Sequence, residues 1–248
     1  MRYFLEIAYK GTDFCGFQIQ ENVQTVQGEL NKVLSLLLKT PIETIGSGRT
    51  DTGVHCQKQF VHFDTENLID IENLVYKLNK ILSKSISINS LRIVKTEAHA
   101  RFDALSRSYE YHIITKKSPF LNGLTYYYPT ELDIEKMNHA AFFLLQYTDF
   151  EAFSKVKTDV KTFNCTIIEA KWTQKNDRLV FQITANRFLR GMVRAIVGTL
   201  LDVGRNKISI YDFENIIKSK NRTKAGRAVP PEGLFLVDVV YPSDIFLT

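Results

Sequence analysis

The chain has 248 residues, a formal net charge of +5 and a pI of about 9.0. This length allows one large domain or two small ones, and it lets the chain bury roughly three-quarters of its unfolded surface. No stretch reaches the roughly 18 uninterrupted apolar residues of a membrane span, so we expect no membrane association. The three cysteines are far apart and lack metal-ligand spacing, which predicts no bound metal and fits a reducing cytoplasm. The basic surplus suits a polyanionic partner.

Hydrophobic periodicity divides the first half of the chain into strands and helices. Apolar residues with period two predict strands, whereas apolar residues at helical spacing between Leu30 and Leu38 predict a helix. In chain order we predict a strand at 2–9, a helix at 26–39, a glycine-rich loop, a strand at 59–64, a helix at 70–82 and a strand at 86–94.

The second half shows a similar alternation. We predict a strand at 108–114, a helix at 134–146, strands at 165–173 and 178–185, helices at 187–203 and 210–219, and a strand at 235–241. Each half opens with a strand, returns a helix against it and adds strands. This order predicts an α/β (α+β) fold with a mixed, largely antiparallel sheet and helices on one face. We expect two lobes, residues 1–104 and 105–248.

The loop of residues 46–55, Gly46-Ser47-Gly48-Arg49-Thr50-Asp51-Thr52-Gly53-Val54-His55, is the most informative stretch, and we call it the signature loop. Its glycines permit positive φ and a close approach of another chain segment or a ligand. Arg49 and Asp51 can lie on the same side of an extended chain, where the guanidinium favours an ionised carboxylate. Such a carboxylate can act as a nucleophile or base, although Arg-x-Asp also suits a loop-closing ion pair.

The predicted helix at 187–203 has two different sides. At about 100° per residue, its apolar side and its basic side fall opposite each other. The basic side carries Arg187, Arg190 and Arg194. With Asn186 as the helix cap, these cations would lie near a positive helix N-terminus, which is unfavourable unless an anion is close. We therefore expect a phosphate or a catalytic carboxylate nearby; a solvated helix face is the alternative.

A second basic feature is the segment 218–227, in which five cations crowd together. We expect it to be a mobile loop that either touches phosphates or is simply solvated. Its cations are Lys218, Lys220, Arg222, Lys224 and Arg227.

Five blocks, in the same order along nearly the whole chain, resemble the tRNA pseudouridine synthase A family. The signature loop carries Arg49-Thr50-Asp51-Thr52-Gly53-Val54-His55, with Thr52 where the family usually has alanine. Phe17 likewise replaces a usual tryptophan in the N-terminal block. The other blocks are Tyr9-Lys10-Gly11-Thr12-Asp13-Phe14-Cys15-Gly16-Phe17-Gln18, His99-Ala100-Arg101-Phe102 with Arg107-Ser108-Tyr109-Glu110-Tyr111, Met192-Val193-Arg194-Ala195-Ile196-Val197-Gly198, and Gly233-Leu234-Phe235-Leu236-Val237.

This resemblance implies two related α/β lobes with joined sheets, a basic central cleft and assembly as a homodimer. It implies isomerisation of uridine to pseudouridine in tRNA, in the anticodon stem-loop. The reaction changes no redox state and transfers no group, so we expect no cofactor. Asp51 would be the catalytic carboxylate, Arg49 its orienting partner, and Arg194 would lie near them.

A tyrosine offers a π-face for stacking an extruded base and a phenol for proton handling. Tyr109 and Tyr111 share one face of the predicted strand at 108–114. The resemblance assigns the stacking position to Tyr109 rather than Tyr111.

Two other functions stay open from the residues alone. Asp51-Thr52-Gly53 is also the tripeptide of aspartic proteases, but such enzymes share one proton between two loops, and Arg49 favours full ionisation. A non-catalytic RNA-binding module or chaperone would suit the cations and tyrosines equally well. A carboxylate would be an unhelpful charge in such a binding site, because its partner is a polyanion.

Overall fold

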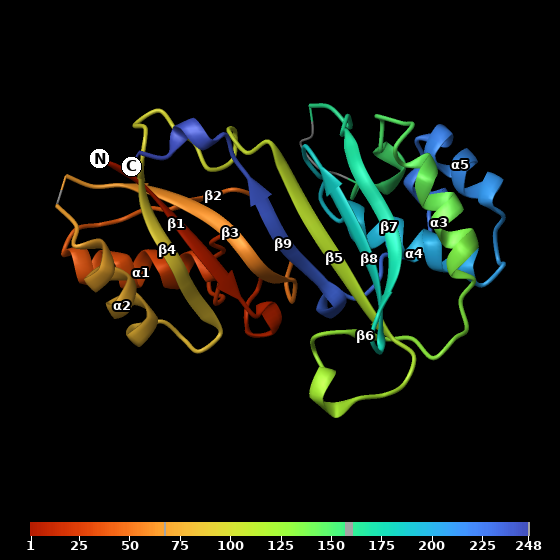
Figure 1. Cartoon of the computed structure of the whole chain (residues 1–248), viewed down its shortest axis with the longest axis horizontal. Helices are drawn as coiled ribbons and strands as arrows, with labels where there is room; N and C mark the ends of the chain where they lie inside the picture. Colours follow the sequence, from red (N-terminus) through yellow and green to blue (C-terminus); the bar gives the residue numbers. More distant parts are fainter. Residues whose placement is uncertain (67, 157–160, 248) are drawn as a thin grey trace. The chain divides into compact units, whose positions relative to one another are not determined.

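A computed structural model gives the fold and describes residues 1–66, 68–156 and 161–247. The chain divides into two compact units. Unit 1 comprises Met1–Leu105 and Phe235–Thr248, and unit 2 comprises Ser106–Leu234. The C-terminal segment therefore belongs to unit 1, although unit 2 precedes it in the sequence (Figure 1).

Unit 1 is built on the antiparallel strands β1 (Arg2–Tyr9), β3 (His55–Asp64) and β4 (Ile86–Val94), with β1 in the middle. Two further strands pair with β3: β2 (Ile45–Gly46) is antiparallel to it, and β9 (Leu234–Val240) is parallel. The pairing of β9 brings Phe235 opposite His55, at the end of the signature loop.

Two helices cover one side of these strands (Figure 1). Helix α1 (Val26–Leu38) begins after Thr25, whose side chain accepts a hydrogen bond from the backbone of Gly28, and α2 (Ile71–Ile81) begins after Asp70, which caps it in the same way. Both helices bury leucines against the sheet and each other: Leu30, Leu34, Leu74 and Leu78.

The C-terminal segment supplies aromatic rings to the core of unit 1. The ring of Phe4, fully buried on β1, lies 5.3 Å from that of Tyr241 and 6.1 Å from that of Phe246, in both cases edge to face. Phe60 on β3 meets the same two rings. This cluster joins Tyr241 and Phe246 to the hydrophobic core of unit 1.

Unit 2 contains the antiparallel strands β5 (Ser106–Ile114), β8 (Arg178–Ala185) and β7 (Ile167–Lys175), in that order, with the short β6 (Tyr126–Tyr127) parallel to β5. Asn176 adopts a positive φ of 52° in the turn between β7 and β8, a conformation that asparagine tolerates better than most residues.

Three helices pack on one side of these strands: α3 (Ile134–Phe143), α4 (Met192–Gly204) and α5 (Ile210–Ser219). α3 contacts β7, α4 and α5. α4 is buried almost all round, which explains its apolar sequence. Ser209 and Asp212 form a capping box at the start of α5.

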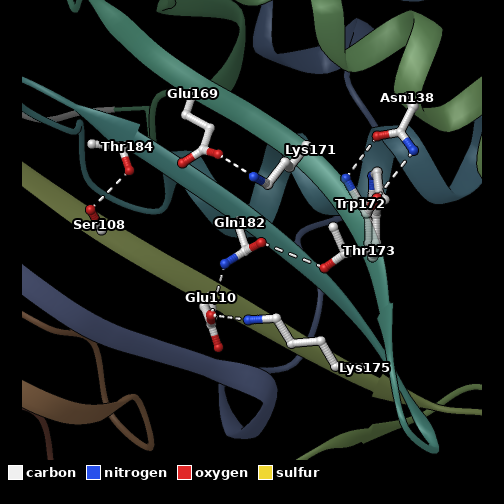
Figure 2. Close-up of polar contacts among 10 residues, drawn as sticks. All are labelled: Ser108, Glu110, Asn138, Glu169, Lys171, Trp172, Thr173, Lys175, Gln182 and Thr184. Atoms are coloured by element: carbon white, nitrogen blue, oxygen red, sulfur yellow. Dashed lines mark hydrogen bonds and ion pairs between the residues drawn. The ribbon is translucent and has the colours of Figure 1, made fainter.

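The opposite face of the unit 2 strands is polar and internally paired, as Figure 2 shows. Glu110 on β5 accepts hydrogen bonds from Lys175 at 2.8 Å and from Gln182 at 3.1 Å. Ser108 and Thr184 share a hydrogen bond of 2.8 Å, and Lys171 pairs with Glu169. On the helix-covered face, Trp172 is fixed by Asn138 of α3, which accepts its backbone N–H at 2.7 Å. The period-two pattern thus separates a polar face from a helix-covered face in this unit.

The mixed α/β class and the order of elements predicted from the sequence are confirmed. The predicted strands and helices agree with the structure to within a few residues, except that β3 begins earlier, at His55, and α4 begins later, at Met192. The two-residue strands β2 and β6 are too short to give a periodic signal.

His62 on β3 gives a testable pH dependence. Burial, with the nearby charges of Arg2 and His99, lowers the pKa of His62 to about 4. Its Nδ1 accepts a hydrogen bond from the backbone N–H of Ala100 at 3.1 Å, so the neutral ring is the one that fits. Because the unfolded chain binds this proton near pH 6.5, unit 1 loses stability as the pH falls from about 6.5 to 4.

We expect His62→Gln to flatten this dependence by up to about 1.4 kcal/mol per pH unit, measured by urea unfolding at several pH values between 4 and 7. The matched control is His139→Gln, because His139 is exposed on α3. A wild-type slope in the His62 variant would contradict the prediction.

Candidate active site

The signature loop lies in unit 1 and connects β2 to β3. Asp51 is half-buried, Arg49 is exposed, and Thr50 between them is buried. Since the middle side chain points inward, alternation along the chain directs Arg49 and Asp51 outward together. Asp51 is therefore neither sealed in the core nor fully open to solvent.

A buried hydrogen-bond network holds the inner side of the loop. The Tyr9 hydroxyl lies 2.8 Å from Thr50 Oγ1 and donates to Gln59 Oε1 at 2.9 Å. The Gln59 amide in turn donates to the Gly48 carbonyl at 2.9 Å. Thus β1 and β3 fix the residues on both sides of Arg49, which is the support that a preorganised carboxylate needs.

Two glycines of the N-terminal block allow this block to press against the loop. A Cβ on Gly11 would lie 2.0 Å from the carbonyl oxygen of Val54, and one on Gly16 would lie 2.7 Å from that of Thr50. Gly16 also has a φ of +90°, which few side chains tolerate. The backbone N–H of Phe17 then donates to the Thr50 carbonyl at 3.2 Å. The backbone of the N-terminal block therefore packs directly against the backbone of the signature loop and holds it in place.

Phe17, which stands where the family usually has tryptophan, is almost fully buried. Its ring stacks on that of Tyr9 at 6.4 Å and lies against Gly46, where a Cβ would come within 2.5 Å of it. The smaller aromatic ring thus fills a site at the start of the signature loop.

His55 has a structural role at the end of the loop. Its Nδ1 accepts a hydrogen bond from the backbone N–H of Gly11 at 3.1 Å, and its ring stacks on Phe235 of β9 at 4.6 Å. It is 1% exposed, so it cannot meet a polynucleotide. The interpretation that His55 is structural and not catalytic agrees with this geometry.

In unit 2 the structure separates the two candidate tyrosines. Tyr111 is fully buried and its hydroxyl donates to the Pro230 carbonyl at 2.8 Å, whereas Tyr109 is half-buried. The ring of Phe188 meets that of Tyr109 edge to face, with centroids 5.0 Å apart. Of these two tyrosines, only Tyr109 has exposed surface that a ligand can contact. This difference is consistent with the assignment of the stacking position to Tyr109 rather than Tyr111.

The predicted helix at 187–203 is wrong at its start. α4 begins at Met192, after Gly191 with a φ of +71°, so Arg187 and Arg190 precede the helix and form no stripe with Arg194. Asn186 does not cap α4: its side chain accepts the backbone N–H of Thr166 at 2.8 Å. Leu189 is nonetheless buried, as the apolar pattern predicted, because tertiary packing buries it without a helix.

Arg194, on the first turn of α4, holds a neighbouring segment. Its Nε donates to the Val229 carbonyl at 2.7 Å, and its own carbonyl accepts the backbone N–H of Val229. One turn later, Gly198 lets the same segment touch the helix, because a Cβ there would lie 1.9 Å from the carbonyl oxygen of Arg227. Residues 226–229 therefore pack against the block Met192–Gly198.

The basic segment 218–227 is not the mobile loop that its composition predicts. Lys218 pairs with Glu214 at 2.8 Å and Lys220 with Asp149 at 2.7 Å, while Arg222 donates to the carbonyls of Ala225 and Gly226. Three of its five cations therefore have partners within unit 2. Lys224 and Arg227 are exposed.

The candidate residues divide between the two units. Arg49 and Asp51 share the signature loop of unit 1. Unit 2 carries Tyr109, Arg187, Arg190 and Arg194, with Phe188 and Gly191 in the same stretch as the arginines. The sequence analysis did not identify Phe188 as a candidate residue. Its position between Arg187 and Arg190 was a signal that could have identified it. In the described part of the chain, no three His, Cys, Asp or Glu side chains group as a metal site requires.

Comparison with known proteins shows the family of the chain. A family model described as tRNA pseudouridine synthase matches residues 7–103 and 145–242, which include the signature loop and α4. Proteins named tRNA pseudouridine synthase A are similar over almost the full length of both chains. The one from Parabacteroides distasonis is 52% identical over 246 residues (99% of this chain, 98% of the relative), and that from Bacillus subtilis is 40% identical over 245 residues (97% and 99%).

The fold and the signature loop thus define the class of the pseudouridine synthases, which are isomerases. Within that class, the chain belongs to the tRNA pseudouridine synthase A family. Across the described residues, no helix combines the length and apolar character needed to cross a membrane.

The contact between the N-terminal block and the signature loop can be tested by substitution of Gly11. We expect Gly11→Ala to lower the free energy of unfolding by about 1–3 kcal/mol and to reduce isomerase activity, because the added methyl group must displace the Val54 carbonyl. Chemical denaturation and single-turnover assays measure the two effects.

Gly48→Ala, in the loop itself, is the matched control for stability, because a Cβ there meets no atom within 4 Å among the described residues. Equal stability of the two variants would show that the close approach at Gly11 does not support the loop.

Proposed function

We propose that this chain converts uridine to pseudouridine in tRNA, at positions in the anticodon stem-loop, with Asp51 as the catalytic residue. The observation that carries the proposal is the half-buried carboxylate of Asp51, held in a fixed loop of a chain that belongs to the tRNA pseudouridine synthase A family. The same membership gives no support to an aspartic-type hydrolase or to a binding module without catalysis.

The reaction breaks the N1–C1′ bond, turns the detached uracil and forms a C5–C1′ bond, so atoms and electrons balance within one nucleotide. The carboxylate of Asp51 starts it by attacking C1′ or C6, or by removing a proton from the ribose. After C–C bond formation, the proton on C5 leaves and N1 gains one. No cofactor takes part in the proposed reaction, because every bond that changes lies in the substrate.

The other candidate residues bind the substrate in this proposal. Arg49, which lies in the same loop, orients the carboxylate and fills the space left by the displaced base. Tyr109, supported by Phe188, stacks on the uracil ring. Arg194 lies at the reaction centre, and Arg187 and Arg190 contact phosphates. Since Arg187 and Arg190 lie on an irregular segment, their guanidinium groups face the RNA from a loop and not from a helix.

Three further features belong to the same proposal. The chain forms two related lobes, predicted at residues 1–104 and 105–248, with residues 235–248 returning to the first lobe. They carry a basic cleft for RNA, which the net charge of +5 supports. The protein assembles as a homodimer. It acts in the cytoplasm, which three thiols without a disulfide support.

The decisive test is Asp51→Asn. Purified protein is incubated with unmodified tRNA transcripts and magnesium, with no other additive, and the digested RNA is separated into nucleosides. We expect wild type to form pseudouridine and Asp51→Asn to form none. RNA affinity stays equal or rises, because a negative charge near phosphates is removed. Substantial turnover by the variant would move the catalytic role to another residue.

The arginines before α4 give a separate prediction. Arg187→Gln or Arg190→Gln weakens tRNA binding and lowers the slope of log affinity against log salt by roughly one per lost phosphate contact. Lys84→Gln, an exposed cation of unit 1, is the matched control. Arg222→Gln acts through stability instead, because its guanidinium binds two backbone carbonyls. An unchanged slope for both Arg187 and Arg190 would make them ordinary surface residues.

A further inference from the structure

Unit 2 carries tyrosines and arginines that the proposed function does not use. Tyr126 and Tyr127 form β6 and pair with the end of β5, and the backbone N–H of Tyr128 donates to the Ile114 carbonyl at 2.9 Å. The backbone of all three tyrosines is therefore fixed along the end of β5. Tyr126 and Tyr128 are half-buried and Tyr127 is exposed.

Three of the rings of this region form a row. The ring of the buried Tyr111 lies 6.4 Å from that of Tyr126, nearly edge to face, and the ring of Tyr126 lies 5.5 Å from that of Tyr128. The row thus begins in the core of unit 2 and ends at its surface. Anchored aromatic rings of this kind lose little conformational freedom when a base stacks on them, which favours binding.

Two arginines lie within electrostatic reach of these rings. The Asp202 carboxylate, and less strongly the Tyr128 hydroxyl, raise the pKa of Arg205. Burial raises the pKa of Tyr126, and the charges of Arg227 and Arg205 act against that rise. The guanidinium groups of Arg205 and Arg227 therefore interact electrostatically with the tyrosine row.

Charges of both signs act on the tyrosine row. Asp202 is shared between Arg205, at 2.7 Å, and Lys207, at 3.4 Å, so the two cations are not fully neutralised. Arg227 is exposed, and Glu232 is the carboxylate that faces Tyr126. Two guanidinium groups and one carboxylate thus act on Tyr126, an arrangement that suits a phosphate backbone better than an acidic side chain of another protein.

α4 connects this region with Arg194. The backbone N–H of Gly226 donates to Thr199 Oγ1 at 2.9 Å, Arg227 rests on Gly198, and Val229 is bound by Arg194. Residues 226–229 therefore run along the helix. At 1.5 Å per residue, Arg194 and Arg205 are about 16 Å apart along its axis, a span of several nucleotides.

We propose that Tyr126, Tyr128, Arg205 and Arg227 form a second RNA-binding surface, the tyrosine–arginine patch. Its rings stack on an unpaired base, and its guanidinium groups bind phosphates of nucleotides beside the one that reacts. The patch rests on the proposed function, because it presupposes an RNA substrate bound at Arg194. It adds a contact that holds the RNA away from the reacting uridine.

Tyr128→Ala and Arg227→Gln test the patch, with affinity for an unmodified tRNA transcript as the measurement. Loss of a stacking ring weakens binding by about tenfold, and Tyr128→Phe restores it because the ring is kept. Arg227→Gln lowers the salt slope by about one. Because Arg227 is exposed, its replacement tests the patch even if Tyr128→Ala fails to fold.

The matched controls lie in unit 1. Tyr76 is an exposed tyrosine whose ring lies 5.4 Å from the ammonium group of Lys80, and Tyr76→Ala should bind tRNA as wild type does. Lys84→Gln is the control for charge.

Two results would overturn the patch. One is wild-type affinity and salt slope in both patch variants. The other is a change in sedimentation mass of the RNA-free protein, which would assign these side chains to a protein contact. A wild-type protein that forms no pseudouridine would instead refute the proposed function, so the two failures are distinguishable.

Discussion

The position of Asp51 depends on a contact between backbones. The carbonyl groups of Val54 and Thr50 lie so close to Gly11 and Gly16 that no side chain fits at either glycine. Tyr9 and Gln59 then tie the inner side of the loop to β1 and β3, so Thr50 points inward and its neighbours point outward. Under the proposed function, a carboxylate held in this way needs little reorganisation when the substrate binds, which is the main advantage of a preorganised site.

Sequence periodicity was sufficient for elements whose burial is one-sided. It placed β1, β4 and α5, because their apolar faces repeat at the spacing of a strand or a helix. It failed before α4, where Leu189 is buried by tertiary packing in a segment that is not helical. The glycine at 191, with its positive φ, was the local signal for the true start.

Composition also failed where long-range partners decide the outcome. The lysines of segment 218–227 suggested a mobile loop, but Asp149 neutralises Lys220 from about seventy residues away in the chain, a partner that no local pattern reveals. The glycines of the signature loop predicted a close approach, and Gly46 has one, to the ring of Phe17, whereas Gly48 has none among the described residues. Phe17 precedes α1 in the sequence, so no local pattern in the loop names it as the partner. The candidate residues were found by type and motif; the contacts that fix them required coordinates.

The return of the C-terminal segment to unit 1 has a consequence for biosynthesis. Unit 2 is one continuous stretch, whereas unit 1 lacks β9 and the rings of Tyr241 and Phe246 until the ribosome has made all of unit 2. A nascent chain can therefore complete its second unit before its first. A chain that stops before β9 therefore lacks one strand and two core rings of the unit that carries Asp51.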